Sequence, residues 1–452
     1  MTPRANTVPR VLAANQGMTD ANVFRPRSRL RPGSFPSSRR ADRLTVTIFT
    51  MSFLAVVLYD SHILSLYNLG DIEIGVNRSL YIVAILGILV GVSQAQMLPL
   101  ALALTGLAYF TALIFQFVYI GSAMDILAGF GFSPFYARLQ LLCIPMITAL
   151  FVRGKASQIL FTIFLVSTIY FAAYLLSSIY ALSSASIDFR AAAFVADYDG
   201  RGGRIVLNNA LSSLALFTAL ASIRDRRHVW AWIVMVLGCL CIYISASRFY
   251  QFCVVFTVIS YFILKRPSRV GVACGALFAG LAIFMLFQIF SGQNPYTFLS
   301  DDISLNARAN SYEAAFPIMV RYFFTGVGFA EQPTADAALV HSNVFFWNDL
   351  GPIGIFYVGG LLGLIIFLGM TLVCFLSPRL ISRSELSGPL YTGISLSAIC
   401  IALYGLIAPT LWYNGLEVFI FVAAGICARR ASVLGQAPVV RPPNVQLIQG
   451  AR

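Results

Sequence analysis

Apolar segments long enough to cross a lipid bilayer recur between residues 44 and 428, and they restrict the chain to one class of fold. A helix needs about 20 mostly apolar residues to span the hydrocarbon core. Charged residues make up only 11% of the 452 residues, whereas a soluble domain carries about 25%. The sequence therefore predicts an all-α, polytopic integral membrane protein in which residues 44–428 form one membrane domain.

Twelve such segments can be delimited. They are 44–66, 79–92, 97–120, 138–152, 158–184, 205–223, 229–245, 249–264, 270–290, 350–375, 389–407 and 414–427. The second, fourth and twelfth are short for a membrane span, which leaves ten or eleven spans as alternatives to twelve. Residues 1–43 hold nine arginines and five prolines without a periodic apolar pattern, which predicts a disordered basic tail. Residues 429–452 form a second predicted tail.

The distribution of positive charge predicts the orientation of these segments. With the N-terminus in the cytoplasm, 23 of the 31 Lys and Arg residues fall on the inner side and eight on the outer side. In membrane proteins, the loops on the cytoplasmic face carry an excess of Lys and Arg. Both tails are then cytoplasmic. This topology explains the net charge of +13. A nucleic-acid interface does not, because the basic residues do not alternate with aromatic residues.

Residues 291–348 form the long polar stretch of the membrane domain and lie on the predicted outer side, between the ninth and tenth segments. The ionisable residues of this stretch are Asp301, Asp302, Arg308, Glu313, Arg321, Glu331, Asp336 and His341. Because charge is scarce in the rest of the membrane domain, we expect the chemistry of the protein in this loop.

Two arginines stand out by their positions. Arg248 lies where two apolar segments meet almost without a loop, so its guanidinium is predicted at the membrane boundary or in a cavity between helices. Snorkelling of the side chain to the interface is the alternative. Arg308 is predicted in the first turn of a short helix near the outer membrane surface, which Pro317 interrupts. A cation is disfavoured there by the helix dipole, which indicates an external anion, with a solvated loop arginine as the alternative.

The second half of the polar stretch holds a glycine pair and a histidine. Gly326 and Gly328 lack the third glycine and the strand context of a nucleotide-binding loop, so they predict a tight turn. His341 is followed by Ser342 and Asn343 where the chain re-enters the membrane. A neutral imidazole there could take a proton from a hydroxyl, although a lone histidine is more often structural. Asp301 with Asp302 could imitate a metal-binding pair, but no cluster with metal-ligand spacing is present.

Together these motifs resemble the O-antigen ligase and O-antigen polymerase superfamily of bacterial envelope glycosyltransferases. The resemblance rests on an SASR element ending at Arg248 and on the outer loop with Arg308, Tyr312 and a TGVG turn. An HSN element at His341 and an LGPIG element follow in the same order as in the family. The resemblance covers roughly residues 205–375.

The resemblance implies a GT-C-like membrane fold and a metal-independent, cofactor-free glycosyl transfer at the periplasmic face of the bacterial inner membrane. The donor would be an oligosaccharide linked to undecaprenyl diphosphate. By position in the motifs, Arg248 and Arg308 would hold the donor diphosphate, and His341 would orient or deprotonate the acceptor hydroxyl. Tyr312, Asn343 and Arg321 are added as substrate-binding candidates, Arg321 only as a neighbour of the phosphates.

Three functions remain open at this point. The first is a polymerase that extends lipid-linked repeat units of a surface polysaccharide, for which a chain-length regulator is a candidate partner. The second is a ligase that joins the glycan to a lipid A core or to protein with the same residues. The third, from another class, is a transporter of lipid-linked oligosaccharides. Transporters tend to place ionisable residues near the bilayer midplane, whereas the charges here lie at the ends of the segments.

Overall fold

The computed structural model describes residues 39–61, 63, 70–94, 96–123, 135, 138–183, 194–195, 204–225, 229–291, 293–296, 303–329, 339–340, 345, 347–381, 383, 386–409, 411–412 and 415–435. Ser37–Arg452 forms one compact unit. The other unit, Met1–Pro36, lies outside the described residues, so the disorder of that part of the predicted tail (1–43) stays a prediction. The same holds for the C-terminal tail beyond residue 435 and for the domain boundaries. For residues 39–43 the prediction of disorder is wrong, because they form the first turn of α1 (Arg39–Ser61).

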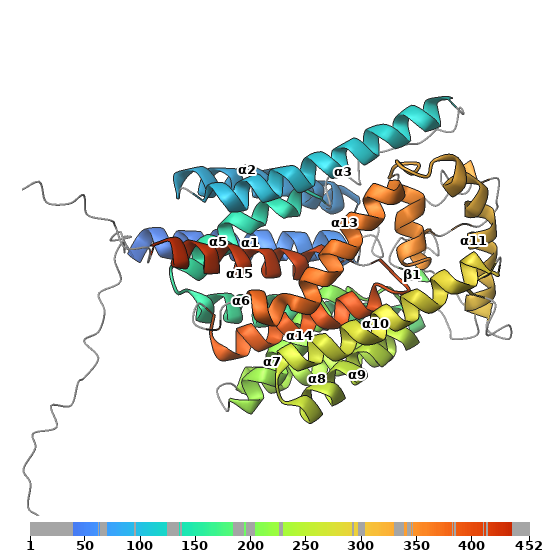
Figure 1. Ribbon diagram of the computed structural model, residues 1–452. Helices are drawn as coiled ribbons and strands as arrows, with labels where there is room; N and C mark the ends of the chain where they lie inside the picture. The colour runs from blue at the N-terminus through green and yellow to red at the C-terminus, as the bar shows by residue number, and fades with distance from the viewer. Residues whose placement is uncertain are drawn as a thin grey trace, which may run out of the picture. The chain divides into compact units, whose positions relative to one another are not determined.

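The described part of the chain is helical, as predicted (Figure 1). The helices are α1 (Arg39–Ser61), α2 (Gly70–Ser93), α3 (Met97–Ala123), η2 (Gln140–Leu142), α5 (Cys143–Val152), α6 (Ala156–Ser183), α7 (Asn209–Arg224), α8 (Val229–Ile244), α9 (Arg248–Leu264), α10 (Pro267–Phe290), α11 (Ile303–Arg321), η4 (Trp347–Asp349), α13 (Pro352–Leu380), α14 (Gly388–Tyr404) and α15 (Leu416–Gly435). Each of the twelve predicted segments overlaps at least one of them. Two-residue strands, β1 (Phe194–Val195) and β2 (Arg204–Ile205), pair antiparallel.

Four helices in the described ranges are long and apolar enough to cross a membrane, namely Met97–Ala123, Ala156–Ile179, Pro267–Ile289 and Pro352–Leu380. Six shorter apolar helices accompany them. Large apolar side chains, such as Ile263, Ile283 and Phe287, are exposed on α9 and α10, as lipid-facing side chains are. The chain is a multi-pass membrane protein, whereas the count of twelve spans and the placement of the polar loop between the ninth and tenth stay predictions.

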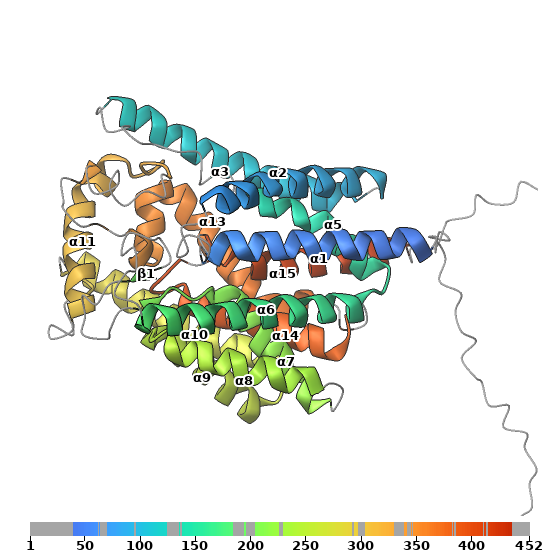
Figure 2. The ribbon, with the colours of Figure 1, turned by 180° about the vertical axis from the view of Figure 1, so that it is seen from behind.

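The core of the bundle is the contact between α7 and α14, which are buried along most of their lengths. A Cβ atom added to Gly393 would lie 2.2 Å from Thr218 Oγ1 and 2.6 Å from Thr218 Cα. The two helices therefore touch almost backbone to backbone, which small residues permit in membrane helices. The helix α14 also packs against α10, α13 and α15, so it holds the centre of the bundle (Figures 1 and 2).

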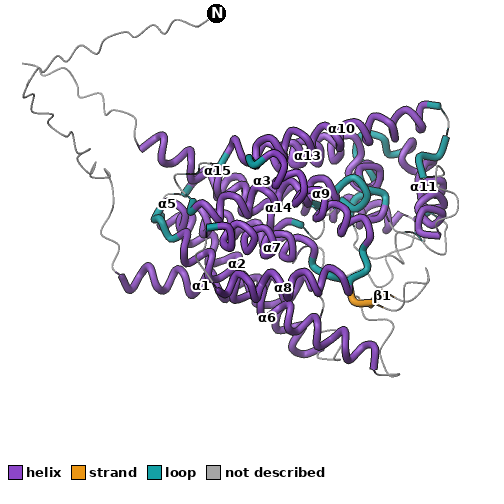
Figure 3. The backbone as a smooth tube through the Cα atoms, turned by 90° about the horizontal axis from the view of Figure 1, so that it is seen from below, coloured by secondary structure: helices purple, strands orange, loops and turns teal. Residues whose placement is uncertain are grey.

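One end of the bundle carries the elements of the polar stretch. The helix α10 ends there, α11 runs across the direction of the other helices, and α13 begins beside it (Figures 1 and 2). Strand β1 lies at this same end (Figure 3). If the long helices cross the membrane, α11, which runs across their direction, lies roughly parallel to the membrane plane. The fold therefore gathers the predicted loop chemistry at one end.

Candidate active site

Arg248 begins α9 at a sharp corner of the chain. Ser245, Ala246 and Ser247 alone separate it from α8, and Ala246 adopts a left-handed φ of 50°. The Arg248 side chain is exposed. Because the dipole disfavours a cation in the first turn of a helix, this position suits an anion that the guanidinium and the helix N-terminus attract together.

Arg308 lies on α11 and contacts the segment that leads into α13. Its Nε donates a hydrogen bond of 3.0 Å to the carbonyl oxygen of Asp349 in η4. The side chain is half-buried. Since α11 begins at Ile303, Arg308 lies in the second turn, and the predicted first-turn position is wrong. Pro317 lies inside α11 and does not interrupt it.

A short segment before α11, Asn294 to Tyr296, makes hydrogen bonds both to α11 and to the residues that lead into α13. The buried Tyr296 hydroxyl donates to the carbonyl of Leu350 at 2.8 Å. Asn294 Nδ2 donates to the carbonyl of Ala309 at 3.0 Å and to Glu313 Oε1 at 3.1 Å on α11. Burial raises the pKa of the Tyr296 hydroxyl, and the Arg308 charge partly offsets the rise. The hydroxyl therefore stays protonated and remains a donor at neutral pH.

Tyr404, the last residue of α14, lies where the surroundings of the two arginines meet. Its hydroxyl lies near the side chain of Ser247, the residue before Arg248, and close enough to Arg308 and Asp349 to interact with them electrostatically. Its ring also stacks on Phe249 with centroids 6.1 Å apart. The α8–α9 corner, the start of α13 and α11 thus converge around the end of α14. Two arginines 60 residues apart in sequence are brought to one end of the bundle.

The remaining described candidates, Tyr312 and Arg321, lie on different parts of α11. Tyr312 is buried, its ring centroid lies 6.4 Å from that of Tyr296, and burial raises the pKa of its hydroxyl. Arg321 ends the helix, is exposed, and lies 5.5 Å from the Tyr322 ring. At 1.5 Å per residue, Arg321 is roughly 20 Å along the helix from Arg308. Tyr312 therefore supports the Arg308 region, while Arg321 is separate from it.

His341 and Asn343 lie outside the described residues. The described residues on either side of them, Val340 and Phe345, are buried. Phe345 packs edge-on against Tyr357 of α13, with ring centroids 5.0 Å apart. The roles of His341 and Asn343 therefore stay predictions.

The TGVGF segment forms the predicted turn and also pairs with an interruption of α13. At Gly360 the backbone of α13 is non-helical, with φ 60° and ψ −156°. The amides of Val327 and Gly328 donate to the carbonyls of Tyr357 and Val358 at 2.9 and 2.8 Å. Irregular backbone at membrane depth is stable where protein surrounds it and satisfies its hydrogen bonds. The glycine pair thus completes a broken helix, which the apolar pattern of 350–375 did not reveal.

Two buried ionisable residues were missed by the sequence analysis. Arg138 is 1% exposed, lies 5.1 Å from the Phe110 ring and 4.5 Å from the Phe329 ring, and donates from Nη2 to the carbonyl of Trp412 at 3.2 Å. Glu417, also 1% exposed, accepts a bond of 2.8 Å from Asn208 Nδ2. The position of both residues at the edges of apolar segments was the signal in the sequence that could have identified them. Arg138 fixes Phe329, and with it the end of the TGVGF segment.

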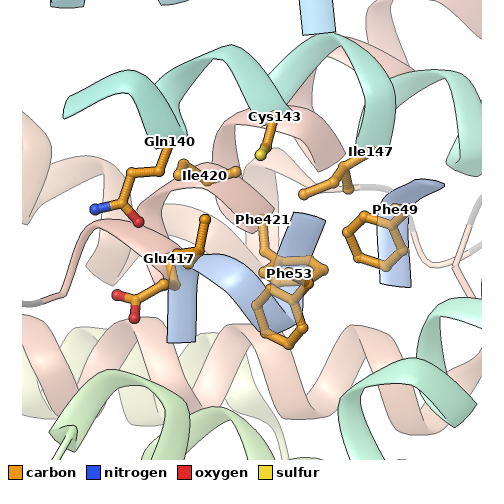
Figure 4. Close-up of a pocket in the computed structure, with 9 residues that line it drawn as sticks. Phe49, Phe53, Gln140, Cys143, Ile147, Glu417, Ile420 and Phe421 are labelled. Atoms are coloured by element: carbon orange, nitrogen blue, oxygen red, sulfur yellow. The ribbon is translucent and has the colours of Figure 1, made fainter. Parts of the chain in front are cut away.

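Glu417 also borders a small cleft between α1, α5 and α15. Figure 4 shows Phe49, Phe53 and Phe421 on one side of it and the side chains of Gln140 and Glu417 on the other. The space is about the size of one water molecule. It cannot hold a sugar or a phosphate, so the candidate site is the arginine-bearing end of the bundle.

The arrangement at that end suits anion binding. Arg248 and Arg308 supply guanidinium groups, which bind phosphate oxygens strongly and in two-pronged geometry. In the part of the chain that the structure describes, no group of three or more His, Cys, Asp or Glu residues could hold a metal ion. The absence of a metal or cofactor requirement stays a prediction.

The fold and this end of the bundle define a multi-pass membrane protein with cationic side chains gathered around one polar loop. Residues 233–368 match the family model described as O-Antigen ligase. This match supports the resemblance to the O-antigen ligase and polymerase superfamily seen in the motifs. In general terms, the family implies an activity of the O-antigen ligase or polymerase type on a lipid-linked glycan and an acceptor. A search of curated proteins found no match to the chain.

Proposed function

We propose that the protein is a polymerase of oligosaccharide repeat units carried on undecaprenyl diphosphate, for a surface polysaccharide such as O-antigen or exopolysaccharide. The observation that carries this proposal is the convergence of Arg308 and the Arg248 corner around Tyr404 and Asp349. A lipid diphosphate is an anion at the membrane surface, where both residues would meet it. The match over 233–368 contains every candidate residue and supports an activity of the O-antigen ligase or polymerase type in general.

The reaction follows from the residue types. The acceptor hydroxyl attacks the anomeric carbon of the donor sugar while the bond from that carbon to the diphosphate oxygen breaks. The pair of electrons in that bond leaves with undecaprenyl diphosphate, and the guanidinium groups of Arg248 and Arg308 stabilise the added negative charge. The hydroxyl proton passes to His341. Tyr312 lies one helical turn from Arg308 on α11, and Asn343 would contact the sugar. Because the guanidinium groups stabilise the charge of the leaving group, the reaction needs no metal or other cofactor.

The charge distribution of the loops supports a location for this chemistry. We assign the protein to the bacterial inner membrane, with both tails in the cytoplasm and residues 291–348 in the periplasm. Donor and acceptor would then meet on the periplasmic side, within the bilayer interface. Nucleic acid is not a partner, and a regulator of chain length is a candidate partner.

The first experiment is a transfer assay with the purified protein in vesicles and an undecaprenyl diphosphate oligosaccharide. A ladder of products from the donor alone is expected for a polymerase. Arg308→Gln should lower the rate about 100-fold or more, because it removes a fixed charge that stabilises the leaving group. His341→Ala should lower the rate by a similar factor, because the proton acceptor is lost.

The matched control is Arg224→Gln. Arg224 also donates a side-chain hydrogen bond, from Nη1 to the Tyr261 hydroxyl at 2.8 Å, but it ends α7, away from the α8–α9 corner and α11. Its loss should leave the rate unchanged. Full activity of both Arg308→Gln and His341→Ala would refute the assignment of the site.

A ligase is the second candidate, because the family description names this activity. In the same assay, a single product that forms only after lipid A core or an acceptor protein is added would identify a ligase. The interrupted helix α13 favours a transporter as the candidate from another class, since discontinuous helices are common in transporters. Movement of labelled donor across the bilayer without any product would establish transport.

A further inference from the structure

The exposed side of α11 changes in character along its length. In the first half it carries Asn306, Asn310 and Glu313. In the second half and the turn that follows, large apolar side chains are exposed. These are Phe316 (45%), Val320 (61%), Phe323 (45%) and Phe324 (71%). We call these four residues the apolar stripe.

The spacing of the apolar stripe places it on one face. Positions 316, 320, 323 and 324 repeat with the period of a helix, and the amide of Tyr322 still donates to the carbonyl of Ile318 at 2.9 Å, so the helical bonding continues past Arg321. The opposite face is buried against the bundle through Ala315 and Met319. Phe323 also packs edge-on against Phe356 of α13, with ring centroids 5.2 Å apart, but all four stripe residues remain 45–71% exposed.

The stripe continues an apolar surface that belongs to a candidate membrane span. Gln116 of α3 donates from Nε2 to the carbonyls of Thr325, at 3.2 Å, and Gly326. On either side of Gln116 in the sequence, Phe115 is 63% exposed and Tyr119 is 78% exposed. Tyrosines near the end of a span are typical of the membrane–water interface. The end of α3 and the end of α11 thus form one exposed aromatic surface.

We propose that the apolar stripe inserts into the interface of the lipid bilayer, between headgroups and acyl chains, while the half of α11 that carries Arg308 remains in water. The orientation of α11 across the bundle end (Figures 1 and 2) brings the helix along the membrane surface, and the change from polar to apolar side chains along it places its second half deeper than its first. Arg321, exposed beside the stripe, then contacts lipid phosphates and not the donor. The bilayer surface itself, and not a protein, is the partner of this face.

The consequence is a fixed depth for the polar loop. One end of α11 is held by lipid and the other by Asp349, Leu350 and the Asn294–Tyr296 segment. Arg308 is thereby kept just above the membrane surface, at the level of a lipid diphosphate. The insertion itself does not depend on the proposed function, and its test needs no glycan donor.

The test uses the full-length protein in vesicles of phosphatidylethanolamine and phosphatidylglycerol, with or without brominated acyl chains. Cys239 is exposed and the other seven cysteines are buried, so Cys239→Ser gives a background for single labels. An environment-sensitive fluorophore is attached at Phe324→Cys or Phe316→Cys on the stripe. Asn310→Cys, on the exposed polar half of the same helix, is the matched control.

We expect blue-shifted emission and about threefold stronger quenching by brominated chains at positions 316 and 324 than at 310. Equal, water-like emission at all three positions would overturn the proposal. So would equal quenching at all three, because the whole helix would then be inserted. A blue shift that appears only after undecaprenyl diphosphate is added would also overturn it, since the stripe would then hold the carrier chain of the donor.

Discussion

The contact between α7 and α14 and the end of the bundle that carries α11 are held together by different forces. At the first, Gly393 packs directly on Thr218, and buried hydroxyls such as that of Ser397 donate to a carbonyl of their own helix. At the second, polar side chains donate to backbone carbonyls of distant segments, as Tyr296 does to Leu350 and Arg308 to Asp349. The core is therefore fixed by shape and the candidate site by directional bonds.

This difference predicts separable effects of mutation. Changes of volume between α7 and α14 should cost stability throughout the bundle, because close-packed interiors cannot absorb added atoms. Loss of a single hydrogen bond at the site end should cost little stability. It should lower activity strongly, because small displacements of catalytic groups reduce rates.

The largest effect is expected from Gly393→Ala. The new Cβ would lie 2.2 Å from Thr218 Oγ1 and 2.6 Å from Thr218 Cα, so the helices must separate, at a cost of about 3 kcal/mol in the free energy of unfolding. Thermal unfolding in detergent measures it. Gly369→Ala is the control, because no atom outside its own helix lies within 4 Å of that Cβ. Equal stability of both variants would show that the core is not fixed by shape.

The second prediction concerns Tyr296→Phe, which removes the bond from the hydroxyl to the carbonyl of Leu350. The free energy of unfolding should fall by about 1 kcal/mol. The transfer rate should fall about 10-fold, because the segment before α11 no longer holds the residues that lead into α13. Tyr391→Phe is a matched control. Its hydroxyl also donates to a backbone carbonyl, that of Pro378, near the opposite end of α14.

The two tyrosine variants should lose similar stability but differ in rate. The initial transfer rate in vesicles and the unfolding temperature are measured for each variant and compared. If Tyr391→Phe slowed transfer as much as Tyr296→Phe, the directional bonds at the site end would have no special role. The comparison between the two regions would then fail.

The third prediction concerns Gln116→Leu, which removes the bonds to the carbonyls of Thr325 and Gly326 while keeping the size of the side chain. Gln116 is half-buried and its loss leaves those carbonyls near water, so the stability change should be about 0.5 kcal/mol. Hydrogen exchange of the Val327 and Gly328 amides should become faster than in the parent protein. Unchanged exchange would mean that pairing with α13 alone holds the turn.

Much of the fold was predictable because it depends on local patterns. The length of the apolar segments and the turn residues between them identified a helix in every predicted segment. The unusual positions of Arg248 and Arg308 in the sequence identified them as site candidates. The interruption of α13 at Gly360 was hidden, because a glycine pair within an apolar run also occurs in continuous membrane helices.

The partners of the site residues were not predictable for a different reason. Arg308 and Tyr296 bind the backbone carbonyls of Asp349 and Leu350, and every residue type has a carbonyl. No residue pattern marks which carbonyl will accept. The buried environment of Arg138 depends in the same way on Phe110 and Phe329, which come from separate segments and meet only in the folded bundle.

The smallest effect is expected from Arg321→Gln. Arg321 and Arg308 are on the same helix, but about 20 Å separates them along its axis, more than the length of a diphosphate and beyond the screening distance of about 8 Å at physiological salt. The initial rate of transfer at saturating donor should therefore stay within about twofold of the parent rate, while Arg308→Gln falls about 100-fold. Because Arg321 lies beside the apolar stripe, its loss should instead weaken quenching of a label at position 324 by brominated lipid. Equal losses of rate in Arg321→Gln and Arg308→Gln would mean that the donor site extends along the whole of α11. The directional bonds at the Arg308 end of the helix would then not define the site.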